Sequence, residues 1–147
     1  MKKIMKHLKR ITALCIAFIL LTSAAMFIYH QDQLRKEAMW LTSKGTMVKV
    51  NGGKINVYRE GSGEDTFVFL SGSGIAAPVY EMKGLYSKFS KENSIAVIER
   101  GGYGYSDVFN DDRNIETIVN QTREALLQSG HQPPYIIVPH SLSGIEA

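Results

Sequence analysis

The sequence predicts an α/β fold in which a leading hairpin is followed by a mostly parallel sheet, and two observations carry that prediction. Asn51-Gly52-Gly53 is a strong turn signal between two apolar, β-branched runs at 46–50 and 55–58, which favours a hairpin. After it, short apolar runs of strand length alternate with longer segments that have one apolar face. Such alternation favours parallel strands joined by crossover helices. The apolar runs are Thr66–Leu70, Ile95–Ile98 and the run that begins at Tyr135.

Two amphipathic segments supply the expected crossover helices. The first begins at Pro78, a residue suited to the first turn of a helix. The second runs from about Asn114 to Ser129, and Gly130 closes it. The apolar face of the first helix comprises Val79, Met82, Tyr86 and Phe89. The apolar face of the second comprises Ile115, Ile118, Val119, Thr122 and Leu126.

Charge is distributed unevenly along the 147 residues, which carry a formal net charge of +3. Five of the 17 basic residues lie in the first ten positions, where no acidic residue occurs, so the rest of the chain is slightly acidic, with 12 basic and 14 acidic residues. No basic face indicates nucleic-acid binding. Cys15 is the only cysteine, which excludes a disulfide within the chain and a cysteine-based metal site. We expect no metal and no organic cofactor.

The N-terminal region is predicted to be a membrane segment. Ile11 to Tyr29 is a run of nineteen residues without a charge, and as a helix it spans roughly 28 Å, close to the thickness of a bilayer core. The basic block before it should stay in the cytoplasm, which places the chain after it outside the cell membrane. The alternative is a cleaved signal peptide with Ser23 and Ala25 at the cleavage site. Since the apolar run continues through residues 26–29, an uncleaved anchor is favoured over secretion.

Residues 135–144 predict a sharp turn that presents a serine. A buried strand from Tyr135 breaks at His140-Ser141-Leu142 and passes into a segment that can open a helix. Strand, turn and helix in that order lift the Ser141 hydroxyl above the carboxyl edge of a parallel sheet. The usual pattern is G-x-S-x-G, and here proline and serine take the places of the two glycines. A plain polar loop after a strand is the alternative interpretation.

Three loops, read in order, resemble the N-terminal half of the α/β-hydrolase family. They are Ser71-Gly72-Ser73-Gly74, the Arg100 to Ser106 loop, and His140-Ser141-Leu142-Ser143-Gly144. The resemblance implies a membrane-anchored serine hydrolase that acts on small-molecule ester or amide-type substrates. Ser141 would be the nucleophile, and the backbone N–H groups of Ser73 and Leu142 would form the oxyanion hole. The Arg100 to Ser106 loop, which has one extra glycine, is expected to be structural.

The resemblance also divides the chain and indicates what it lacks. Residues 1–30 would be the basic segment and membrane helix, residues 31–44 a juxtamembrane linker, and residues 45–147 a partial α/β-hydrolase domain that stops after the serine turn. In this family the triad carboxylate and histidine follow the serine in the chain. Only six residues follow Ser141, and none is histidine. We therefore expect an incomplete chain without appreciable esterase activity on its own.

None of the residues present is expected to replace the missing triad members. Glu146, on the helix after the serine, should be solvated or packed. The family resemblance implies that His140 packs inside the turn, and His131 is expected at the far edge of the sheet. His7 and His30 flank the membrane segment.

Two other classes of protein remain open. Gly72-x-Gly74-x-x-Ala77 after a strand, with Glu99 at the end of the next strand, also fits a dinucleotide-binding oxidoreductase. Pro78 and the leading hairpin argue against that alternative. The third possibility is an inactive membrane-tethered remnant or binding module.

Overall fold

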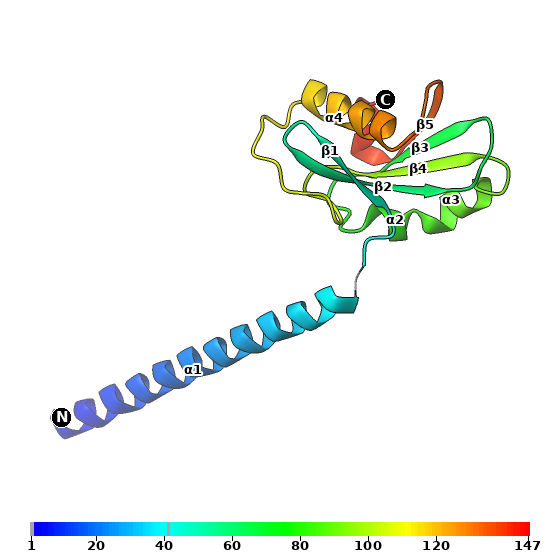
Figure 1. Cartoon of the computed structure of the whole chain (residues 1–147). Helices are drawn as coiled ribbons and strands as arrows, with labels where there is room; N and C mark the ends of the chain where they lie inside the picture. Colours follow the sequence, from blue (N-terminus) through cyan, green and yellow to red (C-terminus); the bar gives the residue numbers. More distant parts are fainter. Residues whose placement is uncertain (1, 41) are drawn as a thin grey trace. The chain divides into compact units, whose positions relative to one another are not determined.

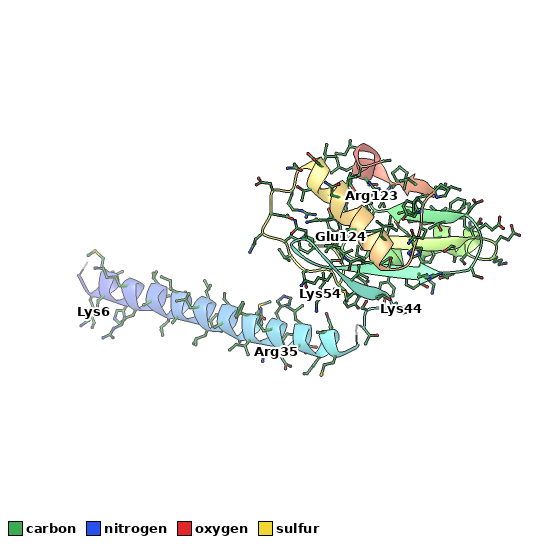
Figure 2. All side chains as sticks on the ribbon, turned by 45° about the horizontal axis from the view of Figure 1, so that its top comes forward. Lys6, Arg35, Lys44, Lys54, Arg123 and Glu124 are labelled. Atoms are coloured by element: carbon green, nitrogen blue, oxygen red, sulfur yellow. The ribbon has the colours of Figure 1, made fainter. Side chains whose placement is uncertain are left out.

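The computed structural model describes residues 2–40 and 42–147, which belong to two compact units, Met1–Thr42 and Ser43–Ala147 (Figure 1). The first unit contains one helix, α1 (Lys2–Trp40). In the described part of the chain, this is the one helix long and apolar enough to cross a membrane. Figure 2 shows Lys6 near one end of α1 and Arg35 near the other, so charged side chains flank the apolar stretch. The helix continues through residues 31–40, where Asp32 and Lys36 form an ion pair at 2.6 Å.

The second unit is built on a five-stranded sheet with the order β1-β2-β4-β3-β5. The hairpin strands are antiparallel to each other, and β2 is antiparallel to β4, whereas β3 is parallel to both β4 and β5. The predicted hairpin followed by parallel strands is therefore confirmed. The strands are β1 (Thr46–Val50), β2 (Gly53–Glu60), β3 (Thr66–Leu70), β4 (Ser94–Glu99) and β5 (Tyr135–Pro139).

Helices cover both faces of this sheet (Figure 1). On one side lie α2 (Pro78–Glu81) and α3 (Lys83–Phe89), and on the other lies α4 (Ile115–Gln128). Side chains of β3 and β4 alternate between the two layers, because successive residues of a strand point to opposite faces. The layer under α4 contains Val68, Leu70, Ala96 and Ile98, and the layer over α2 and α3 contains Phe69, Ile95 and Val97. Both central strands are therefore buried on two faces, as their continuous apolar runs predicted.

The helices differ in detail from their predicted apolar faces. The segment after Pro78 breaks at Met82 into two short helices, although Val79, Met82 and Tyr86 are buried as expected. In α4, Ile115 is exposed and Gln121 is buried instead. The Gln121 amide donates to the Asn51 carbonyl at 3.0 Å, so a polar residue that was not part of the predicted face secures the hairpin.

Strand β5 was predicted to be buried and is half exposed, with Ile136 at 43% and Ile137 at 37%. It pairs only with β3 and forms one edge of the sheet. An apolar groove of about 300 Å³ lies between β5 and α4, lined by Leu126, Tyr135 and Ile137 among others. The carboxyl end of this edge strand carries the predicted serine.

Candidate active site at the carboxyl edge of the sheet

Ser141 lies at the turn that leaves β5, in the unusual backbone conformation expected of a strained serine turn. Its φ is 56°, and no other described residue except glycine has a positive φ. A left-handed conformation costs an L-residue roughly 1–2 kcal/mol, so the surroundings must hold it in place. The chain continues as one turn of 3₁₀ helix, η1 (Ser141–Ile145), and the Ser141 side chain is exposed.

Ser143 supplies much of the restraint on this turn. It is fully buried, and its hydroxyl lies 2.9 Å from both the Leu70 and the His140 carbonyl oxygens. The same hydroxyl accepts the His140 N–H at 2.8 Å, and that N–H also donates to the Leu70 carbonyl at 2.9 Å. The turn is thereby tied to the end of β3. The sequence indicated only that Ser143 takes the place of the second glycine of the usual pattern, and its bonding role was not predicted.

The loop after β3 lies directly against the serine. A side chain added at Gly72 would place its Cβ 3.0 Å from the Ser141 Cβ and 3.1 Å from the His140 Nδ1. Both distances are tighter than most real Cβ contacts, so a larger residue at this position would require Ser141 and His140 to shift by a few tenths of an ångström. Ser73 follows Gly72, and within the described residues its N–H has no hydrogen-bond acceptor. The predicted pair of backbone donors, Ser73 and Leu142, thus belongs to the two segments that meet at the Ser141 side chain.

Arg100 lies behind this loop and is almost fully buried. Its Nη2 donates to the Ser71 carbonyl at 2.8 Å and to the Gly72 carbonyl at 3.2 Å, and its Nη1 pairs with Glu146. The guanidinium also lies 4.7 Å from the centre of the Tyr103 ring. Glu146 is packed, one of the two outcomes expected of it. Burial raises the pKa of its carboxyl group, and the charge of Arg100 opposes that rise.

None of the four histidines forms a hydrogen bond with the Ser141 hydroxyl in the part of the chain that the structure describes. His131 is buried before β5, at the end of the strand away from Ser141 and roughly 17 Å along it at the usual rise per residue. His140 is exposed, so the expectation that it packs inside the turn was wrong: β5 lies at an edge and offers it no cover. His7 and His30 belong to α1, in the other unit. Among the described residues, the Ser141 hydroxyl has no hydrogen-bond partner.

The residues of the dinucleotide-binding alternative do not form a nucleotide site. The Glu99 carboxylate is fully buried, and it accepts the Asn56 side-chain amide at 2.9 Å and the Tyr105 N–H at 2.8 Å. A side chain at Gly104 would collide with it. The glycine loop leads into α2, which begins only at Pro78 and has four residues. Glu99 thus holds the loop that follows β4, and no helix N-terminus begins at Gly74.

The sheet order, the two helix layers and the strained serine turn together define part of an α/β-hydrolase fold. Among solved structures, the Cif epoxide hydrolase from Acinetobacter nosocomialis matches with a TM-score of 0.62 and 20% identity, over 70% of this chain and 32% of that one. The epoxide hydrolase VrEH1 from Vigna radiata matches with a TM-score of 0.60 and 23% identity, over 69% and 33%. Identities this low show the fold alone.

In sequence, the chain is similar to the uncharacterized protein YbdG of Bacillus subtilis (strain 168), with 64% identity over all 147 residues. The chain spans 45% of the length of that relative. No protein-family model matches the chain.

Proposed function

We propose that this chain is the nucleophile-bearing part of a serine hydrolase that cleaves ester or related acyl bonds. Ser141 is the proposed nucleophile, and the N–H groups of Ser73 and Leu142 form the proposed oxyanion hole. The observation that carries the proposal is the positive φ of Ser141 at a strand-to-helix turn against which Gly72 packs closely. That turn exposes a hydroxyl beside two backbone segments, as acyl transfer to a serine requires.

The chemistry follows from these positions. The Ser141 oxygen would attack the substrate carbonyl as its proton passes to a general base, and the two N–H groups would stabilise the negative charge that develops on the carbonyl oxygen. One such donor is worth about 2.7–4 kcal/mol in related enzymes. The bond to the leaving group then breaks, the base returns the proton to the departing alcohol or amine, and water hydrolyses the acyl-enzyme. A serine hydroxyl also needs a general base, usually a histidine oriented by a carboxylate. Since the chain spans 45% of YbdG, we propose that a longer protein supplies both groups from residues that follow this chain.

The membrane assignment belongs to the same proposal. Residues 11–29 of α1 would form an uncleaved anchor, residues 31–44 a linker and residues 45–147 the partial hydrolase domain. The domain would then act outside the cytoplasmic membrane, because the basic residues precede the apolar run. A signal sequence passes the same tests of length and composition.

The experiment is fluorophosphonate labelling of membranes from cells that naturally make the protein, read by gel mobility. We expect a labelled band that disappears in Ser141→Ala and persists in the matched control Ser62→Ala. Ser62 is an exposed serine in the turn before β3, at the end of that strand away from Ser141. A band well above 16.4 kDa would identify a longer hydrolase, and a band at 16.4 kDa would mean that the base comes from a second polypeptide. Absence of label at either size contradicts the proposal.

A further inference from the structure

We propose that Arg100 is a positioning residue for the oxyanion hole: it orients the Ser73 N–H by holding the carbonyl groups of the two preceding residues. The inference rests on the proposed function, because it concerns the same reaction. Arg100 belongs to the loop after β4, and among the described residues it bonds to Ser71, Gly72 and Glu146 and forms no hydrogen bond with the Ser141 side chain. Its effect on the reaction would pass through the backbone of the loop after β3.

Peptide geometry supplies the first step. The Gly72 carbonyl and the Ser73 N–H belong to one peptide unit, which is planar and trans, so the two groups point in opposite directions. Arg100 Nη2 binds the Gly72 carbonyl at 3.2 Å and the Ser71 carbonyl at 2.8 Å. Both carbonyls are therefore turned toward Arg100. The Ser73 N–H therefore points away from Arg100.

The Arg100 side chain is itself held by two further contacts, one with Glu146 and one with the Tyr103 ring. Nη1 pairs with Glu146, and the exposed fractions of the two side chains are only 6% and 4%. The guanidinium lies over the Tyr103 ring, and the Tyr103 hydroxyl accepts the Gly74 N–H at 3.3 Å. A buried cation with these fixed contacts has little freedom to move. Gly72, which precedes Ser73, is thereby bonded to Arg100. Gly74, which follows Ser73, is bonded to the Tyr103 side chain that packs on Arg100.

Glu146 also links this cation to the serine turn. It follows η1, the helical turn that begins at Ser141, so one guanidinium connects the loop that carries Ser73 to the segment that carries Ser141 and Leu142. These segments are about seventy residues apart in the chain. The rigid planar guanidinium holds two carbonyls and a carboxylate in one fixed geometry, which a lysine ammonium on its flexible stem would not reproduce.

The test uses the natural full-length protein in membranes, with Arg100→Lys and the control Arg113→Lys. Arg113 lines the same cavity as Arg100 but bonds to Asp111 and Gln121, and to neither loop carbonyl. We expect Arg100→Lys to lower the fluorophosphonate labelling rate, and the kcat for a small p-nitrophenyl ester, by about 10- to 100-fold. The KM should change less than about threefold, because an oxyanion hole acts in the transition state. Arg113→Lys should match the wild type.

A labelling rate and kcat within about twofold of wild type in Arg100→Lys would overturn the inference while leaving the proposed function intact. An unlabelled wild type would instead overturn the proposed function, and this inference with it. If Arg100→Lys does not accumulate, the labelling rate and kcat are measured in the double variant Arg100→Met, Glu146→Leu. Values within about twofold of wild type in that variant would likewise overturn the inference. Replacing a buried ion pair with apolar groups of similar volume is often neutral for stability, so this variant removes the positioning contacts while keeping a packed core.

Discussion

Gly72→Ala should impair the proposed nucleophile without altering any polar group. The φ of Gly72 is outside the left-handed region, so alanine fits the backbone, and the obstacle is space alone. The new Cβ would lie 3.0 Å from the Ser141 Cβ, and ordinary carbon–carbon contacts lie at about 3.5–4.0 Å. Ser141 and the loop must therefore separate by a few tenths of an ångström. A misplacement of about 1 Å costs an enzyme about 100-fold, so a shift of this smaller size should lower the labelling rate by about 3- to 10-fold.

The assay is the time course of fluorophosphonate labelling for wild type, Gly72→Ala and the control Gly84→Ala. Gly84 lies on α3, and nothing stands within 4 Å of the Cβ that alanine would add there. Gly84→Ala should label like wild type, and a melting curve should show whether Gly72→Ala stays folded. Overpacking typically costs about 1–3 kcal/mol, less than most domains have available. Wild-type labelling by a folded Gly72→Ala would refute the close approach of the loop to Ser141.

Three further predictions address the turn, the pH response and the membrane segment. Ser143→Ala removes a buried hydroxyl that bonds to two carbonyls, and it should lower the free energy of unfolding by about 1–3 kcal/mol in denaturant titration and slow labelling. Burial lowers the pKa of His131 in the folded protein below the ordinary histidine pKa of about 6.5. Neutral His131 therefore contributes fully to the free energy of unfolding above about pH 6.5, and this contribution is lost as the pH falls below that value. The denaturant midpoint of unfolding should therefore differ less between pH 7.5 and pH 5.5 in His131→Asn than in the wild type. An equal difference in both proteins would show that His131 is not the source of the pH dependence. The wild type should stay in carbonate-washed membranes, and a variant that lacks residues 11–29 should be released from them. A wild-type protein that is soluble and begins near residue 25 would indicate cleavage of a signal peptide instead.

The sequence was most informative where structure depends on neighbours in the chain. The hairpin follows from Asn51-Gly52-Gly53, whose central glycine has a φ of 97°. The start of α4 follows from Asn114, whose side chain accepts the Thr117 N–H at 2.8 Å. The alternation of apolar strands with amphipathic helices was enough to predict the sheet. Each of these signals lies within a few residues of the element it specifies.

Features that depend on distant contacts were missed. Gln121 is buried because it meets the hairpin 70 residues earlier, which no helical periodicity reveals. The Arg100–Glu146 pair joins residues 46 positions apart, and the sequence favours neither partner over other charged residues. The restraint on Ser141 comes from the bond between Ser143 and the end of β3, 73 positions away. The motif located the serine, and tertiary contacts determine its conformation.

The most direct test of the central claim is identification of the residue that a fluorophosphonate modifies. The full-length protein from its natural membrane would be labelled and digested, and the modified peptide sequenced by mass spectrometry. We expect a single phosphonylated residue, Ser141, in the peptide that contains β5 and η1. Modification of a neighbouring serine, such as Ser71 or Ser73, with Ser141 intact would contradict the central claim.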